Sequence, residues 1–269
     1  MRTLRVAAAG LAALIAISVA GCGGGDGTTD TSSGTSSSAS ASATVTDSVT
    51  VFAAASLTES FKTIGKEFEA AHPGTTVTFN FAGSSALATQ LNQGAPADVF
   101  ASAAPKNMAT VTDAGNGAGS PTTFVKNQLV IATAKGNPKK ITNLADLTKP
   151  GLKVALCAEA VPCGAAAKTA REAAGVQLTP VTLEQDVKAA LSKVKLGEVD
   201  AALVYRTDAE AASADVDAIE FPESAKAVNN YPIVVLKEAK NPAGAQAFVD
   251  YVLSADGSRV LTEAGFQAP

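Results

Sequence analysis

The feature that most constrains this 269-residue chain is an alternation of short apolar runs with segments of helical spacing, which begins near residue 49. Val49–Ala55 is a short, mainly apolar run, which is typical of a buried strand. In Leu57–Ala71 the apolar residues recur at helical spacing, and Pro73-Gly74 ends the predicted helix. A strand–helix alternation of this kind predicts an α/β fold with parallel sheets covered by helices on both faces.

The same alternation continues to the C-terminus. Further strands are predicted at Thr76–Phe81, Asp98–Ser102, Gln128–Ala134, Leu152–Cys157, Val199–Tyr205 and Tyr231–Leu236. Helices are predicted at Ser85–Asn92, from Pro105, at Ala165–Ala174, at Leu183–Lys195 and over Pro242–Gly265. These elements occupy about 220 residues, a length that fits two α/β lobes better than one.

The N-terminal residues have the pattern of an export signal. Arg2 and Arg5 precede Val6–Ala20, an apolar run that is short for a helix spanning a bilayer. The run ends in Val19-Ala20-Gly21-Cys22, which resembles the lipobox of bacterial lipoproteins. We therefore expect removal of residues 1–21, a lipid on Cys22, and a protein anchored to the outer face of the cell membrane. The alternative is an ordinary signal peptide with a chance cysteine.

Residues 23–47 consist almost entirely of Gly, Ser, Thr and Ala, with Asp26, Asp30 and Asp47 as the only charges. Such a segment has no apolar periodicity and cannot offset its ordering entropy by burial. We expect residues 22–48 to form a flexible tether between the lipid and the folded part.

Composition excludes several classes of function. The net charge of −4 leaves no basic excess for nucleic-acid binding, so we expect no nucleic-acid partner. His72 is the only histidine, which argues against zinc sites and histidine triads; its position at a helix end favours contact with helix carbonyls. The chain has no Walker loop and no Gly-x-Ser-x-Gly elbow, and the spacing of Gly115–Gly119 does not fit a dinucleotide loop. We do not expect an enzyme.

With Cys22 lipidated, Cys157 and Cys163 remain as an even pair in an exported chain. Such a pair favours a disulfide over two free thiols. The bridge would close a short loop, for which loop-closure entropy gives about 2 kcal/mol of stabilisation. Two free thiols would instead leave a nucleophile available, and with it the alternative of an enzyme.

Several strands run into small or hydroxyl residues and then into a helix start. The turns are Ala55-Ser56-Leu57, Gly83-Ser84-Ser85 and Val161-Pro162-Cys163-Gly164. Helix N-termini expose unpaired N–H groups and partial positive charge, so several of them at one cleft would form an anion site without a basic side chain. The alternative is that each serine only caps its own helix, with Ser56 and Glu59 as a capping box.

The motifs resemble those of the molybdate-binding proteins of ABC importers. The matching segments are Val51–Thr58, Phe81–Ala88, Gly94–Ala103, Val161–Gly164, Asp186-Val187 and Leu203–Ala209. They occur in order from about residue 49 to the end, and the first three together are specific for that family. The resemblance implies the type II periplasmic-binding-protein fold, in which two α/β lobes close on a ligand. It implies a lobe I at residues 49–127 and 234–269, a lobe II at 128–233, and crossings near Asn127–Thr133 and Tyr231–Leu236.

In that family two serines, two backbone amides and a tyrosine hold the oxyanion. Carried onto this sequence, the resemblance assigns the ligand-binding groups to the side chains of Ser56, Ser84 and Tyr205 and to the backbone N–H groups of Cys163 and Val187. Relatives often have alanine at the position of Cys163, and a backbone N–H survives that change. The resemblance implies no catalytic residue, no cation ligand and no cofactor.

The implied ligand is molybdate, and tungstate matches it in size and charge. A dianion without a proton needs only donors, which hydroxyls and amides supply. The alternative is the same fold with sulfate or an organic anion; an iron site is disfavoured because only Tyr205, of three tyrosines, lies at the predicted cleft. The expected partners are the permease subunits of an ABC importer and, through the lipid, the membrane; the protein is expected to be a monomer.

Overall fold

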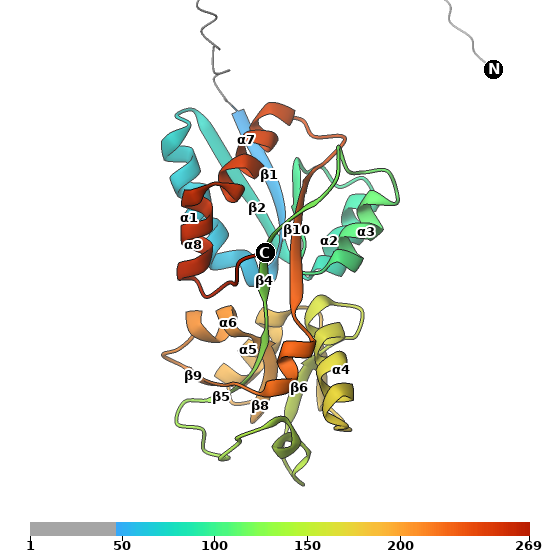
Figure 1. Cartoon of the computed structure of the whole chain (residues 1–269), viewed down its shortest axis with the longest axis vertical. Helices are drawn as coiled ribbons and strands as arrows, with labels where there is room; N and C mark the ends of the chain where they lie inside the picture. The colour runs from blue at the N-terminus through green and yellow to red at the C-terminus, as the bar shows by residue number, and fades with distance from the viewer. Residues whose placement is uncertain (1–46) are drawn as a thin grey trace, which may run out of the picture. The chain divides into compact units, whose positions relative to one another are not determined.

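The structure is a computed structural model that describes residues 47–269. The predicted signal peptide, the lipid site at Cys22 and the tether up to residue 46 lie outside the described residues. Two five-stranded sheets organise the described part of the chain (Figure 1).

The first sheet has the strand order β2-β1-β3-β10-β4. Its strands are β1 (Asp47–Ala54), β2 (Thr75–Ala82), β3 (Val99–Ala101), β4 (Thr122–Asn127) and β10 (Asn229–Val235). β1 runs parallel to β2 and β3, whereas β10 runs antiparallel to β3 and β4. We call this sheet, with the helices packed on it, lobe I.

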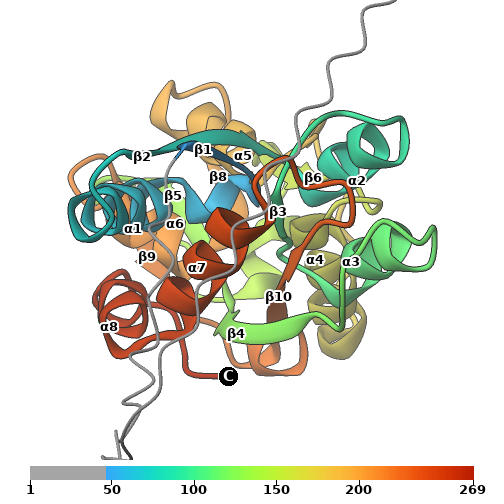
Figure 2. The ribbon, with the colours of Figure 1, turned by 90° about the horizontal axis from the view of Figure 1, so that it is seen from above.

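Helices cover both faces of the lobe I sheet (Figure 2). They are α1 (Thr58–Ala71), α2 (Ser84–Asn92), α3 (Pro105–Thr112), α7 (Pro242–Leu253) and α8 (Ala255–Glu263). Because side chains alternate along a strand, successive residues of β1 enter different cores. Val51 packs with Phe61 of α1 and Phe248 of α7, and Phe52 packs on the other face with Leu87 of α2.

The second sheet has the strand order β7-β6-β8-β5-β9, and we call it and its helices lobe II. Its strands are β5 (Leu129–Ala134), β6 (Val154–Cys157), β7 (Thr182–Glu184), β8 (Ala201–Tyr205) and β9 (Val216–Ile219). Its helices are α4 (Pro162–Ala174), α5 (Val187–Lys195), α6 (Arg206–Ala211) and the 3-10 helices η2 (Leu144–Thr148) and η3 (Pro222–Lys226). One core of mainly Ala, Val and Leu side chains holds this lobe together.

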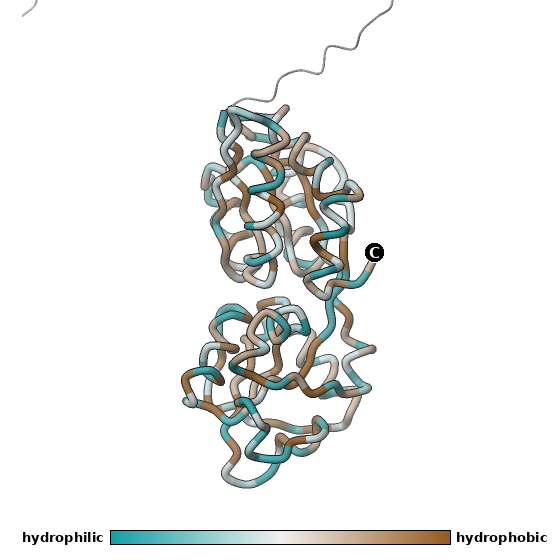
Figure 3. Tube along the Cα trace, turned by 90° about the vertical axis from the view of Figure 1, so that its left-hand side faces the viewer, coloured by the Kyte–Doolittle hydropathy of each residue, from teal (hydrophilic) through white to brown (hydrophobic). Residues whose placement is uncertain are grey.

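Two neighbouring chain segments join the lobes (Figure 3). The first passes from β4 to β5 through Gln128. The second enters β10 after η3, and its first residue, Asn229, already pairs with Asn127 in the lobe I sheet. All of β10 therefore belongs to lobe I, and the boundary expected at residue 233 falls inside this strand.

The prediction of parallel sheets is wrong in part, because both sheets are mixed. β5 is antiparallel to β8 and β9, as β10 is to its neighbours. The sequence patterns do not predict β4, β7 and β9. β4 begins with two exposed threonines, β7 has no buried residue and β9 has one. The helix predicted from Leu183 begins at Val187, because Thr182–Glu184 pairs with β6 as β7.

Every helix within residues 47–269 is too short or too polar to span a bilayer.

Candidate functional site

A small cavity lies where the two lobes meet. The residues that line it come from six segments at or just after the carboxyl ends of β1, β2 and β3 in lobe I and of β6, β7 and β8 in lobe II. They are Ala54, Ala55, Ser56, Gly83, Ser84, Ala103, Val161, Pro162, Cys163, Asp186, Val187 and Tyr205. All five residues predicted to bind the ligand are among them. Ligands of α/β sheets bind at these strand ends, so this cavity is the candidate binding site.

Ser56 lies in η1 (Ala55–Leu57), a 3-10 helix between β1 and α1. The alternative of a capping box does not hold at Ser56, because α1 begins at Thr58 and the Ser56 side chain makes no cap hydrogen bond. The Ser56 hydroxyl instead lies 2.9 Å from the hydroxyl of Tyr231 on β10. Because η1 separates the end of β1 from the start of α1, Ser56 does not cap α1 and instead lines the cavity.

Ser84 is the first residue of α2 and is buried. Its Oγ accepts the N–H of Ala103 at 2.9 Å, which ties α2 to the loop after β3. The preceding residue, Gly83, lies so close to the carbonyl oxygen of Gln185 in lobe II that a Cβ there would overlap it. Glycine at 83 therefore permits the two lobes to approach this closely.

Cys163 lies in the first turn of α4, after Pro162 at its first position. The first-turn N–H groups of a helix have no intrahelical acceptor, so the backbone here offers donors to the cavity. The predicted disulfide is confirmed: Cys157 and Cys163 are joined, and their Cα atoms lie 5.7 Å apart. Position 164 requires glycine, because a Cβ there would overlap the carbonyl oxygen of Ala158. The bridge fixes the start of α4 to the end of β6.

Val187 is the first residue of α5 and is buried at the cavity. Asp186 caps this helix: its Oδ1 accepts the N–H of Ala189 at 2.9 Å. This hydrogen bond occupies the carboxylate on its own helix, while the N–H of Val187 lies in the first turn, where no intrahelical acceptor exists.

Tyr205 ends β8, and its side chain is 1% exposed. Its hydroxyl is buried and makes no hydrogen bond of good geometry among the described residues, although the side chains of Tyr231 and Asn229 lie close to it. Burial raises the pKa of Tyr205 well above its usual value, so the hydroxyl keeps its proton at neutral pH. A buried donor without a well-formed hydrogen bond is costly unless a ligand satisfies it, which makes Tyr205 the strongest structural sign of a polar ligand here.

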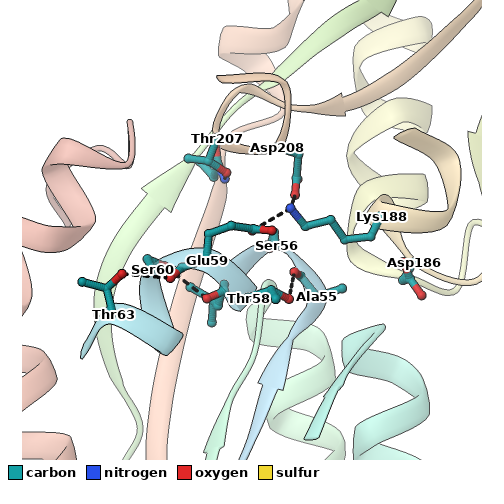
Figure 4. Close-up of polar contacts among 12 residues, drawn as sticks. Ala55, Ser56, Thr58, Glu59, Ser60, Thr63, Asp186, Lys188, Thr207 and Asp208 are labelled. Carbon is teal, nitrogen blue, oxygen red and sulfur yellow. Dashed lines mark hydrogen bonds and ion pairs between the residues drawn. The ribbon is translucent and has the colours of Figure 1, made fainter. Parts of the chain in front are cut away.

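Three charged side chains meet beside this cavity (Figure 4). Lys188 Nζ lies 2.7 Å from Glu59 Oε2 of lobe I and 3.0 Å from Asp208 Oδ1 of lobe II. Asp208 is fully buried, and burial raises its pKa to about 6 despite the opposing effect of the Lys188 ammonium. Burial alone would lower the pKa of Lys188, but the Asp208 and Glu59 carboxylates outweigh that effect and raise it.

The cavity offers donors without a basic side chain. No Lys or Arg stands among the described residues that line it; its polar groups are hydroxyls, first-turn amides and the Asp186 carboxylate, which caps α5. His72 lies at the end of α1, where its Nδ1 is 3.0 Å from the carbonyl oxygen of Phe68, which confirms its predicted contact with a helix carbonyl. Among residues 47–269 no group of three His, Cys, Asp or Glu side chains is placed to hold a cation.

Sequence reasoning missed residues that do not line the cavity but contact residues in or next to its wall. It placed only Tyr205 at the cleft, whereas the Tyr231 hydroxyl also lies beside it, in contact with the cavity-lining Ser56. Glu59 appeared as a capping residue, whereas it pairs with Lys188 across the lobes. No local pattern could have revealed these contacts, because Ser56 and Tyr231 lie 175 residues apart and Glu59 and Lys188 lie 129 apart.

Comparison with known proteins agrees with this geometry. The family described as bacterial extracellular solute-binding protein matches residues 49–267. The molybdate-binding protein ModA of Mycobacterium tuberculosis strain H37Rv is 51% identical over 222 residues, which cover 82% of this chain and 85% of that protein.

Two solved structures share the fold. The periplasmic molybdate-binding protein of Azotobacter vinelandii superposes with a TM-score of 0.72 at 21% identity, covering 82% of this chain and 99% of that one. The sulfate-binding protein SubI of Mycobacterium tuberculosis H37Rv superposes with a TM-score of 0.73 at 18% identity, covering 82% and 87%. The described chain thus has the α/β periplasmic-binding-protein fold, and it belongs to the family of bacterial extracellular solute-binding proteins that includes the molybdate-binding proteins.

Proposed function

We propose that this protein captures molybdate, and tungstate with it, outside the cell membrane and delivers the anion to the permease of an ABC importer. The observation that carries the proposal is the donor set of the cavity: Ser56, Ser84 and Tyr205 hydroxyls with the first-turn amides of Cys163 and Val187. The 51% identical mycobacterial molybdate-binding protein supports this choice of anion over sulfate, which a fold likeness alone does not distinguish.

The chemistry of the cavity suits a tetrahedral dianion. Molybdate carries no proton near neutral pH, so it accepts hydrogen bonds on every oxygen and donates none. Each charge-assisted hydrogen bond contributes about 1.5–3 kcal/mol, so several such bonds hold the ion without a buried countercharge. Closure of the lobes removes water, and the lower dielectric strengthens the attraction between the anion and the helix N-termini.

Capture requires an opening and closing motion. Ser56 and Ser84 belong to lobe I, whereas Cys163, Val187 and Tyr205 belong to lobe II, so the full donor set exists only when the lobes approach. The two joining segments beside Gln128 and Asn229 form the hinge. The protein acts as a monomeric carrier rather than an enzyme.

The lipid anchor belongs to the same proposal. Cleavage before Cys22 and lipidation of its sulfur would hold the carrier beside its permease, with residues 22–48 as the tether. Replacement of Cys22 by Ser should release the exported protein from the membrane fraction. Retention of the variant in that fraction would contradict the anchor while leaving the ligand proposal untouched.

Isothermal titration of the purified chain with molybdate, tungstate, sulfate and hydrogen phosphate tests the ligand. We expect one-to-one binding of the first two anions and at least a hundredfold weaker binding of the others. Preferential binding of sulfate or phosphate would keep the family and overturn the ligand.

A further inference from the structure

Each serine of the cavity is hydrogen-bonded to a group of the protein behind it. A hydroxyl has one proton and two lone pairs, so a neighbour that donates to it leaves the proton free for something else. At Ser84 the direction is certain, because the N–H of Ala103 can only donate, and it lies 2.9 Å from Ser84 Oγ. The Ser84 proton is therefore available to the cavity.

At Ser56 the neighbour is the Tyr231 hydroxyl at 2.9 Å, and either oxygen could be the donor in isolation. Both side chains are buried, with Ser56 5% and Tyr231 0% exposed, so no bulk water shares the contact. Whether Ser56 presents a proton or a lone pair to a ligand depends on which way this one hydrogen bond runs.

The side chain of Asn127 decides the direction. Its Oδ1 accepts the N–H of Gln128 at 2.9 Å, which places its Nδ2 on the other side. Nδ2 donates to Thr207 Oγ1 at 2.8 Å and, over 3.4 Å, to the Tyr231 hydroxyl oxygen. An amide nitrogen cannot accept, so Tyr231 receives a hydrogen bond from Asn127 and keeps its own proton for another acceptor.

Within residues 47–269 Ser56 Oγ is the acceptor that meets the Tyr231 hydroxyl in hydrogen-bond geometry; the Tyr205 hydroxyl also lies near Tyr231, but it makes no hydrogen bond of that geometry. Donation in the opposite sense would leave the Tyr231 proton buried without an acceptor, which proteins avoid. Burial also raises the pKa of Tyr231, so its proton is present throughout the neutral range. The chain of hydrogen bonds thus runs from Asn127 through Tyr231 to Ser56, and the Ser56 proton points outward.

We propose that Tyr231 is a positioning residue for specificity: by donating to Ser56 Oγ, it makes Ser56 a donor toward the cavity and so disfavours oxyanions that carry a proton. This inference rests on the proposed function, since it concerns the same cavity. Ser84 likewise accepts a hydrogen bond, from the N–H of Ala103, and keeps its own proton for the cavity. Hydrogen phosphate needs an acceptor for its proton, and two serines that are both turned to donate do not supply one.

The test is the Tyr231→Phe variant, which keeps the buried ring and removes only the hydroxyl. Tyr251→Phe is the matched control, because the Tyr251 hydroxyl donates to Glu67 on lobe I and does not line the cavity. Titration calorimetry on the full chain should show a five- to thirtyfold loss of molybdate affinity for Tyr231→Phe. Tyr251→Phe should bind as the wild type does. The ratio of molybdate to hydrogen phosphate affinity should shrink at least threefold in Tyr231→Phe.

A double-mutant cycle with Ser56→Ala separates positioning from packing. In the Ser56→Ala background, Tyr231→Phe should change molybdate affinity by less than twofold, because the group on which it acts is gone. An equal loss in both backgrounds, or an unchanged affinity in the single variant, would overturn the proposal. A wild-type chain that binds none of the anions would instead overturn the proposed function itself.

Asn127→Asp provides a second route if Tyr231→Phe unfolds below the assay temperature. The new carboxylate can accept the Tyr231 proton, which reverses the chain and turns the Ser56 proton away from the cavity. We expect a molybdate loss of at least fivefold that largely disappears in the Ser56→Ala background. A loss of the same size in both backgrounds would count against the assigned polarity.

Discussion

Lys188 Nζ lies 2.7 Å from Glu59 Oε2, and this ion pair joins the first turn of α5 in lobe II to the first turn of α1 in lobe I. Both residues stand close in sequence to groups of the cavity, Lys188 next to Val187 and Glu59 three residues after Ser56. The same ammonium also pairs with buried Asp208, so lobe II holds Lys188 in place for its partner in lobe I (Figure 4). The pair exists only while the lobes are together.

Glu59→Gln should therefore speed ligand release. A partly exposed ion pair is worth about 1 kcal/mol, so we expect a roughly fivefold faster molybdate dissociation that disappears at high salt. Stopped-flow competition measures this rate. Glu67→Gln is the control, because Glu67 lies on the same helix but pairs with Arg259 within lobe I. Equal rates for Glu59→Gln and the wild type at low salt would contradict a role in closure.

Asp208→Asn should change how stability depends on pH. The pKa of Asp208 is raised from 3.8 to about 6 in the folded protein, so between these pH values the folded state binds a proton that the unfolded chain lacks. The free energy of unfolding of the wild type should thus rise, relative to the asparagine variant, as pH falls from 7 to 4, by up to about 3 kcal/mol.

Denaturant unfolding of both proteins at several pH values measures this difference, and titrating groups far from Asp208 cancel in the comparison. A difference that stays constant with pH, or one that changes in the opposite sense, would show that Lys188 keeps Asp208 ionised down to its ordinary range.

Gly83→Ala should hinder closure without harming either lobe. The added Cβ overlaps the carbonyl oxygen of Gln185 when the lobes meet, but the backbone angles at Gly83 suit alanine. We expect at least a tenfold loss of molybdate affinity, with an unchanged melting temperature in the absence of ligand. Gly119→Ala is the control, since a Cβ there has open space. Normal affinity in Gly83→Ala would mean that the bound state does not need this close approach.

Tyr205→Phe should weaken binding and spare the fold. The hydroxyl is buried and makes no hydrogen bond of good geometry among the described residues, so its removal costs the free protein nothing and relieves an unsatisfied group. Loss of a donor to a buried anion should cost about 1–3 kcal/mol of binding free energy, while the melting temperature stays equal or rises. Calorimetry and thermal unfolding measure the two quantities. Unchanged affinity would remove Tyr205 from the site.

Much of this molecule follows from local patterns. The strand over Val49–Ala55 and the helix over Leu57–Ala71 are close to the observed β1 and α1, because an apolar run and a helical spacing depend only on neighbours in the chain. The disulfide is also local, since six positions separate Cys157 and Cys163. Edge strands such as β7 could not be predicted, because their positions are half exposed and lack an apolar run.

The candidate site also has features that local patterns predict and features that they do not. The turns that carry Ser56, Ser84 and Cys163 are visible as small and hydroxyl residues between a strand and a helix, and they line one cavity as expected. The role of Ser56 within its turn was not visible, because a capping box and a 3-10 helix are both compatible with Ala-Ser-Leu-Thr-Glu. Packing against Tyr231, rather than local preference, decides between them.

The sequence by itself determined the strand–helix alternation, the helix starts that supply donors, the disulfide and the family. Only the tertiary structure decided the antiparallel pairing of β10, the Asn127–Tyr231–Ser56 hydrogen bonds and the Lys188–Glu59 pair. The reason is sequence distance: periodicity, turn chemistry and a short loop act between near neighbours, whereas these contacts join residues 104, 175 and 129 positions apart. Such contacts depend on the order of strands in a sheet and on the approach of two lobes, which no local pattern encodes.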